Sequence, residues 1–133
     1  FWKILYDLCV VGVTIVVSTA YLDEAERCNR VALMYHGSFL KVDTPTGIKA
    51  MINKPLLEIV TNRPVEAEQI LKTNPEYMHA LRSGNAVRVF VDNVARSLPA
   101  IEKLLFSHKI SVLTIHKTTP SLEDIFVEAI APR

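Results

Sequence analysis

The sequence is poor in cysteine and glycine. Its two cysteines, Cys9 and Cys28, form no C-x-x-C pair, so a disulfide framework is not expected and a four-cysteine metal site is excluded. Buried thiols in a reducing cytoplasm are the expected state of both. The four glycines lie too far apart to form either G-x-G-x-x-G or the G-x-x-x-x-G-K-[ST] loop. The chain therefore lacks both of these phosphate-binding devices.

The chain also lacks an excess of one charge and a long apolar run. Fifteen Lys and Arg residues stand against 14 Asp and Glu residues, so the basic surface of a nucleic-acid-binding protein is missing. The longest uncharged stretch runs from Leu8 to Leu22, about 15 residues, whereas a membrane-spanning helix needs roughly twenty. Because 50% of the residues are hydrophobic, the composition predicts a folded globular protein.

Residues 1–53 have the pattern of an α/β unit. A helix is predicted from the first residue, with Phe1, Leu5 and Leu8 on one stripe and Gly12 at its end. Because this helix begins without a cap, we expect the chain to be part of a longer protein. The β-branched run Val13–Val17 is apolar on both sides, which predicts a strand buried on both faces of a parallel sheet. After it we expect a short helix over Leu22–Arg27, a hairpin of Val31–Tyr35 and Phe39–Val42, and a helix from Thr44-Pro45 toward Ile52.

From Lys54 onward the pattern becomes a regular alternation of short strands and helices. The predicted strands are Leu56–Thr61, Glu76–Ala80, Ala86–Val91 and Ile110–His116, with helices over Pro64–Lys72 and Val94–Ser107 and a turn over Arg82–Asn85. This β-α-β-β-α-β order is that of the ferredoxin-like α+β fold. A last amphipathic helix follows Thr119-Pro120. The sequence therefore predicts two domains, residues 1–53 and residues 54–133.

Residue types that carry chemistry form no recognisable site. The residues considered are the four histidines, which lack metal-ligand spacing, and two serines in no nucleophile elbow: His36, His79, His108, His116, Ser18 and Ser121. Asp23 and Glu24 are adjacent carboxylates at a helix start, where they fit partners of the helix dipole better than an acid-base pair. We therefore expect no catalytic, cofactor or metal site in this chain.

One segment carries a more specific pattern. Residues 13–37 form an apolar run, then Ser-Thr-Ala, then Asp-Glu-Ala-Glu, then Arg-Val, a second apolar run and a glycine turn. This order resembles the segment after the Walker B motif in ATP-binding subunits of ABC transporters. The stretch Gly37–Pro45 continues the resemblance. The stretch Pro120–Phe126 looks like the closing helix of the ABC-2 and drug-resistance exporter branch, whose ATPases carry an extra C-terminal domain.

The resemblance has a consequence at Ala20, where the family has a histidine that contacts the γ-phosphate of ATP. A methyl group neither donates a hydrogen bond nor carries charge. The resemblance thus implies a degenerate nucleotide site at Ala20. The alanine is either natural, as in tandem ATPases that pair one substituted site with a complete one, or engineered. The resemblance also implies that the Walker A loop, Q-loop, signature motif and Walker B acid precede Phe1 in a parent protein. That parent would hydrolyse ATP with Mg²⁺, whereas this chain alone would hold neither.

The resemblance implies a function for each part of the chain. Residues 1–53 would be the tail of an ABC ATPase core, and residues 54–133 an accessory ferredoxin-like domain for regulation, dimerisation or permease coupling. The implied partners are a transmembrane permease subunit and a second ATP-binding domain, at the cytoplasmic face of the membrane.

Two alternatives remain open: a ferredoxin-like module that senses a small molecule, and an interaction domain without a ligand. Exposed strand edges also predict self-association, in which Val13–Val17 and Val31–Tyr35 pair with a second copy or pack against the accessory domain.

Overall fold

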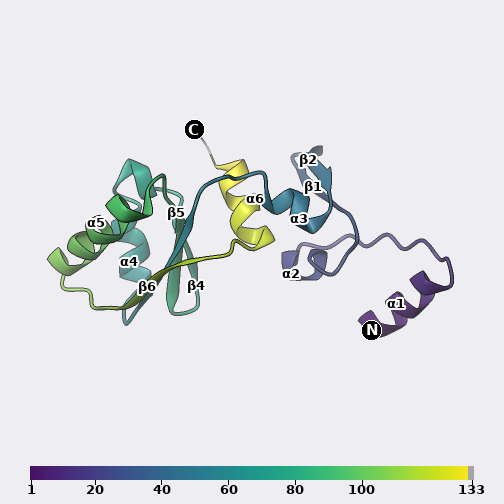
Figure 1. Cartoon of the computed structure of the whole chain (residues 1–133), viewed down its shortest axis with the longest axis horizontal. Coiled ribbons are helices and arrows are strands. Elements are labelled where there is room, and N and C mark those ends of the chain that lie inside the picture. The colour runs from purple at the N-terminus through teal and green to yellow at the C-terminus, as the bar shows by residue number, and fades with distance from the viewer. Residues whose placement is uncertain (132–133) are drawn as a thin grey trace.

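Two separate antiparallel sheets, with helices around them, make up the α/β structure of the chain (Figure 1). The computed structural model describes residues 1–131. In chain order the elements are α1 (Trp2–Val10), α2 (Leu22–Ala25), β1 (Val31–Tyr35), β2 (Ser38–Asp43), α3 (Pro45–Lys49), β3 (Leu56–Thr61), α4 (Pro64–Leu71), the 3₁₀ helix η1 (Pro75–Tyr77), β4 (Leu81–Ser83), β5 (Ala86–Phe90), α5 (Val94–Ser107), β6 (Val112–Thr118) and α6 (Leu122–Ile130).

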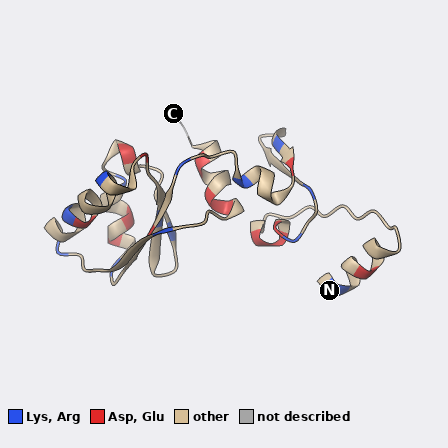
Figure 2. Ribbon diagram, in the orientation of Figure 1, with Lys and Arg blue, Asp and Glu red and all other residues tan. Residues whose placement is uncertain are grey.

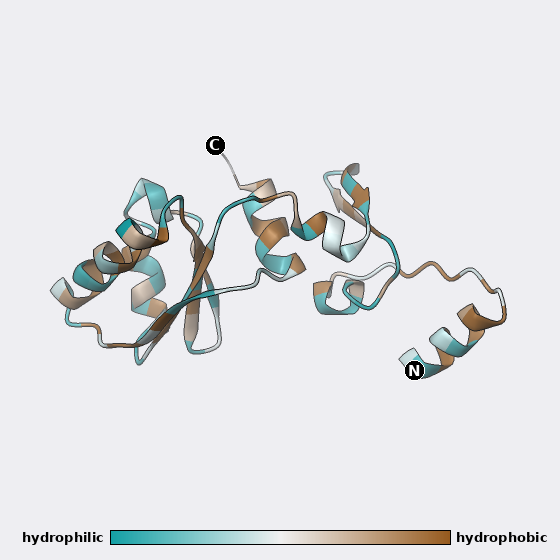
Figure 3. Ribbon diagram, viewed as in Figure 1, coloured by the Kyte–Doolittle hydropathy of each residue, from teal (hydrophilic) through white to brown (hydrophobic). Residues whose placement is uncertain are grey.

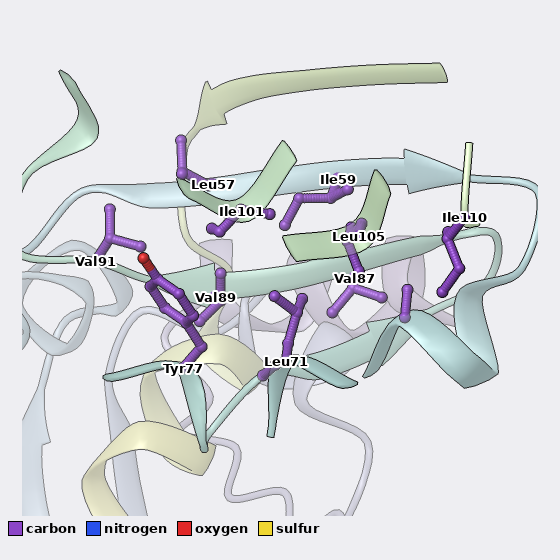
Figure 4. Packing of buried hydrophobic residues seen from close by; sticks show 12 residues of the cluster. Leu57, Ile59, Leu71, Tyr77, Val87, Val89, Val91, Ile101, Leu105 and Ile110 are labelled. Carbon is purple, nitrogen blue, oxygen red and sulfur yellow. The ribbon is translucent and has the colours of Figure 1, made fainter. Parts of the chain in front are cut away.

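The larger sheet has the strand order β4-β5-β3-β6, and every neighbouring pair is antiparallel. Alternate residues of its central strands, such as Leu57 and Ile59 of β3 and Val87 and Val89 of β5, point to the face covered by α4 and α5 (Figure 4). Together with the helices they form the larger hydrophobic core. The arrangement is compatible with the ferredoxin-like fold expected from the order of the elements.

The smaller sheet is the hairpin of β1 and β2, and a second hydrophobic core lies against it. Its buried members come from both parts of the sequence: Ala25, Val31, Leu33 and Ile48 from the first 53 residues, and Leu56, Phe90, Leu122 and Ile125 from the remainder. The last helix, α6, packs against both α2 and α3. The end of the chain therefore returns to the segment that precedes the larger sheet.

The predicted strand over Val13–Val17 is not formed. The segment pairs with no strand of the described residues, and Val16 is 92% exposed. Figure 3 shows it as a predominantly hydrophobic, extended stretch after α1. A strand is held by hydrogen bonds to a neighbouring backbone, so β-branched composition alone does not make one. The segment follows α1, which has no buried residue (Figure 1). Helix α1 contacts the chain again at Arg27, whose backbone carbonyl accepts a hydrogen bond from the Tyr6 hydroxyl at 3.1 Å and whose guanidinium lies 5.6 Å from the centre of the Trp2 ring.

The predicted strand over Glu76–Ala80 is wrong as well. Pro75 instead opens η1, and the side chain of Asn74 caps this turn by accepting a hydrogen bond from the backbone N–H of Glu76 at 2.9 Å. The second strand of the sheet is β4, which begins at Leu81 and pairs with β5 across a turn at Gly84. The other predicted strands and helices are confirmed, with ends that shift by up to a few residues.

Charge and hydropathy are distributed as the composition predicts. Lys and Arg residues and Asp and Glu residues occur in both parts of the chain, although the charged residues of α2 and α6 are all acidic (Figure 2). None of the helices within residues 1–131 has the length and apolar character needed to cross a membrane.

Candidate functional site

The junction between α6, α2 and the larger sheet gathers the most elaborate set of polar contacts in the described part of the chain. Leu122 and Ile125 of α6 are fully buried, and they pack with Ile48 of α3 and with Leu56 and Phe90 of the sheet. Because these side chains come from both parts of the sequence, α6 fixes the first part of the chain against the second.

The start of α6 is defined by a capping box. The side chain of Ser121 accepts a hydrogen bond from the backbone N–H of Asp124 at 3.3 Å, and Oδ2 of Asp124 accepts one from the backbone N–H of Ser121 at 2.8 Å. These two bonds satisfy N–H groups that a helix start leaves without intrahelical partners. Pro120 precedes the box. The sequence thus sets the residue at which α6 begins.

Arg88 of β5 clamps the start of α6 to the sheet. Its Nη2 donates to Oδ2 of Asp124 at 2.9 Å, and its Nε donates to Oδ1 at 3.1 Å. Nη2 also donates to the backbone carbonyl of Thr119 at 3.1 Å, while Nη1 pairs with Glu58, which lies directly opposite Arg88 on β3. Asp124 is 5% exposed, so this bidentate pair supplies the counter-charge that a buried carboxylate needs.

The environment of Arg88 changes its proton affinity. Burial lowers the pKa of the guanidinium, but the hydrogen bond to Asp124 and the negative charges of Asp124 and Glu58 outweigh burial and raise the pKa above its ordinary value. Arg88 therefore stays positively charged wherever the protein is folded in ordinary buffers. On the other side of Glu58, Nε2 of His116 lies 3.6 Å from its Oε1.

The turn that carries Ala20 lies at the other end of the same junction. The hydroxyl of Thr19 donates to Oε2 of Glu24 at 2.6 Å and accepts a hydrogen bond from the backbone N–H of Tyr21 at 2.9 Å. These bonds fix the backbone on both sides of Ala20, whose methyl group is exposed. Tyr21 is the N-cap residue of α2.

Glu26, directly after α2, connects this turn region to α6. Its Oε1 accepts a hydrogen bond from the backbone N–H of Leu122 at 3.4 Å and lies 2.6 Å from Nζ of Lys49 in α3. One carboxylate thus contacts both α3 and the first turn of α6. The negative charge of Glu26 at the N-terminal end of α6 is favoured by the helix dipole.

A cleft of about 540 Å³ lies between α6, η1 and the end of β5. Its apolar residues include Met51 and Phe90, and its charged residues include Lys54, Asp92 and Glu128. His79 also lines it: Nδ1 lies 3.4 Å from Oε2 of Glu128, while Nε2 is buried and has no hydrogen-bond partner among residues 1–131.

The other candidate residues that the sequence offered lie apart from one another in the structure. His36 lies in the β1–β2 turn with a positive φ, and Nδ1 of His108 contacts the carbonyl of Leu104 at the end of α5. Cys9 is exposed on α1, so the expectation of a buried thiol is wrong there, whereas Cys28 is half-buried beside the smaller core. Asp23 lies in the first turn of α2, and Ser18 is exposed before the turn.

Sequence reasoning missed Arg88 and Glu58. The signal was a charged residue in the middle of each of two apolar strands, Leu56–Thr61 and Ala86–Phe90. A charge at such a position needs a partner, and opposite charges in two strands of one sheet form a natural pair. Within the described residues, no three His, Cys, Asp or Glu side chains are arranged to hold a metal ion. The absence of a catalytic or cofactor site stays a prediction.

Comparison with known proteins gives consistent matches. Residues 44–130 match the family described as ATP-binding protein DrrA1-3-like, C-terminal domain. The chain is 25% identical over 134 residues to the daunorubicin resistance ATP-binding protein DrrA2 of Streptomyces coeruleorubidus, covering 95% of this chain and 41% of that protein. It is 27% identical over 132 residues to the probable multidrug ABC transporter ATP-binding protein YbhF of Escherichia coli, covering 96% of this chain and 22% of that protein. It therefore spans less than half of either relative.

Proposed function

Because the chain belongs to the family of DrrA1-3-like ATP-binding protein C-terminal domains, we propose that it couples the ATPase core of an ABC-type exporter to a C-terminal regulatory unit. The relatives that it resembles are ATP-binding proteins of ABC transporters, named for drug or multidrug resistance. The exporter, its ATPase activity and its partners belong to this proposal.

One observation carries the coupling role: α6 packs against α2, which follows the turn at Ala20, while Arg88 fixes its start to the larger sheet. A displacement of the sheet would therefore move α6 against the turn. In the ABC family this turn carries the histidine that contacts the γ-phosphate. The accessory unit would in this way affect nucleotide binding or dimerisation without contacting ATP itself.

The proposal assigns residues 1–53 to the tail of an ATPase core and residues 54–133 to a ferredoxin-like accessory domain. Support for the second assignment comes from the strand order β4-β5-β3-β6 and from the family match over residues 44–130. The boundary at residue 53 stays a prediction, because α6 shares a core with elements on the other side of it.

The parent protein would bind ATP and Mg²⁺, and its partners would be a permease subunit and a second ATP-binding domain at the cytoplasmic face of the membrane. Ala20 would make the site of this chain degenerate, so hydrolysis in the parent would depend mainly on its other site. This chain supplies no Walker A loop, and we expect it not to bind or hydrolyse ATP by itself.

Two measurements test the proposal. The coding sequence upstream of Phe1 should contain a G-x-x-x-x-G-K-[ST] motif, and its absence would contradict membership in a larger ATPase. Isothermal titration of the chain with MgATP should show no binding in the micromolar range. Micromolar affinity would mean that the chain holds a nucleotide site of its own, contrary to the proposal.

The second candidate function is a small-molecule sensor, which the cleft between α6 and η1 favours. The cleft is of the size used by small ligands and combines apolar walls with charged groups. Amino acids, divalent metal salts and nucleotides should each be tested for stabilisation of the chain in thermal unfolding. A ligand that raises the Tm of the wild type but not of Glu128→Gln would establish the sensor function. No shift with any of them would leave the coupling role as the better account.

A further inference from the structure

Two carboxylates, one in a very short helix and one directly after it, contact different parts of the junction. Helix α2 has four residues, and helices of this length are unstable without tertiary contacts. Glu24 in this helix accepts the hydrogen bond of Thr19, while Glu26 directly after it contacts the start of α6 and Lys49. Contacts therefore hold the helix on two sides: the turn at Thr19 on one side, and the start of α6 with Lys49 on the other.

On the α6 side, Glu26 contacts a backbone N–H that has no acceptor within its own helix. The backbone N–H of Leu122 belongs to the first turn of α6, where no intrahelical acceptor is available. Glu26 supplies that acceptor, and its pairing with Lys49 holds the carboxylate in place. Two residues further along, Asp124 is bound by Arg88. The position of the first turn of α6 is therefore set jointly by the sheet and by Glu26.

On the turn side, the conformation depends on the hydroxyl of Thr19. It donates to Glu24 and accepts from the backbone N–H of Tyr21, so a shift of α2 changes both bonds at once. Ala25, between the two carboxylates, is buried in the same core as Leu122 and Ile125. A movement of α6 is therefore transmitted to α2 by packing as well as by charge.

We propose that Glu26 is a positioning residue through which the placement of α6 on the sheet sets the conformation of the turn at Thr19–Tyr21. The inference deepens the proposed coupling role and takes its biological meaning from it. Its test, however, uses only this chain and needs no nucleotide, so its failure is distinguishable from the failure of the upstream motif or of the MgATP titration.

The test measures amide hydrogen exchange by NMR in the 133-residue chain. In Glu26→Gln, the Tyr21 amide should exchange about fivefold faster than in the wild type, the change expected from weakening one hydrogen bond of ordinary net strength. Arg88→Met, which acts from the far side of α6, should also accelerate it. Glu66→Gln is the matched control, because it removes the carboxylate of an exposed ion pair between Glu66 in α4 and Arg63 directly before this helix. It should leave Tyr21 unchanged.

A merely structural role of Glu26 predicts a different result. In that case Glu26→Gln accelerates exchange at Leu122 but leaves Tyr21 at the wild-type rate, and this outcome overturns the proposal. The Thr19→Val background supplies a second readout: because the turn has then lost its hydroxyl, Glu26→Gln should have no further effect on Tyr21. An equal effect in both backgrounds also overturns it. If Glu26→Gln does not fold, Lys49→Met perturbs the same carboxylate and provides the same measurements.

Discussion

Arg88 shows how one charged residue in a strand decides the placement of a helix more than 30 positions away. Its guanidinium lies on the face of the sheet opposite α4 and α5, because its neighbours Val87 and Val89 point into the larger core. From the sequence alone, a charged residue in an apolar strand calls for a partner but does not identify it. Glu58 could be paired with Arg88 once the sheet order was known, whereas Asp124 depends on where α6 docks.

We predict that Arg88→Met lowers the free energy of unfolding by about 3 kcal/mol. The reason is that Asp124 remains buried without a counter-charge, and breaking a buried ion pair on one side typically has this effect. Urea unfolding followed by circular dichroism measures the change. Arg96→Met is the control: Arg96 is largely exposed in its pair with Glu76, so its loss should matter by less than about 1 kcal/mol. Equal effects of the two substitutions would show that the clamp stabilises nothing.

The contribution of Arg88 should not depend on pH between 7 and 10. Because the partners raise its pKa in the folded state above the unfolded value, the stabilisation is fully present below the unfolded pKa, which already lies above this range, and is lost only as pH rises through the still higher folded value. The difference in unfolding free energy between wild type and Arg88→Met should therefore be the same at pH 7 and pH 10. A smaller difference at pH 10 would contradict the direction of the shift.

At the scale of elements, the sequence predicted helices that are set by their own caps and apolar spacing better than strands that depend on a distant neighbour. The helix over Val94–Ser107 has the predicted bounds, because Asn93 caps its start and its apolar residues repeat at helical spacing. The strand predicted over Val13–Val17 failed for the opposite reason. Its stability depends on a neighbouring strand, and a β-branched composition carries no information about whether that neighbour is present.

The capping box of α6 allows a test at this scale. Ser121→Ala should lower the free energy of unfolding by about 1 kcal/mol, because the N-cap oxygen that accepts from Asp124 is lost. Ser107→Ala is the matched control, since the Ser107 hydroxyl bonds only to groups at the exposed end of α5. Thermal unfolding of both variants provides the comparison. A Tm for Ser121→Ala equal to that of the control would mean that packing of Leu122 and Ile125 alone sets the start of α6.

At the scale of the whole molecule, the candidate site is built from contacts that sequence patterns do not report. Glu26 and Leu122 are 96 positions apart, and Arg88 and Asp124 are 36 apart. The resemblance to ABC ATP-binding subunits predicted the turn at Ala20 and the closing helix as separate motifs. That α6 packs against α2, and so brings the two motifs together, follows from the shared core and not from either motif.

The exposed apolar side chains at the start of the chain lead to a last prediction, self-association. Those of Phe1, Val10 and Val16 are each more than 80% exposed. They belong to α1 and the extended segment after it, which are largely hydrophobic in Figure 3. Apolar surface gathered in this way favours association, and the backbone of residues 14–17, which pairs with no strand of the described chain, offers a second copy a strand to pair with.

Sedimentation velocity over a range of protein concentrations should therefore show a dimer or larger species, and Val16→Lys should shift the equilibrium at least tenfold toward monomer, equivalent to about 1.4 kcal/mol. Phe106→Lys is the control, because Phe106 is as exposed as Phe1 but lies on α5, outside the N-terminal segment. If association is driven by the N-terminal segment, only Val16→Lys weakens it. If both variants weaken it alike, the contact is unspecific, and a wild type that remains monomeric at several hundred micromolar would exclude pairing through this segment.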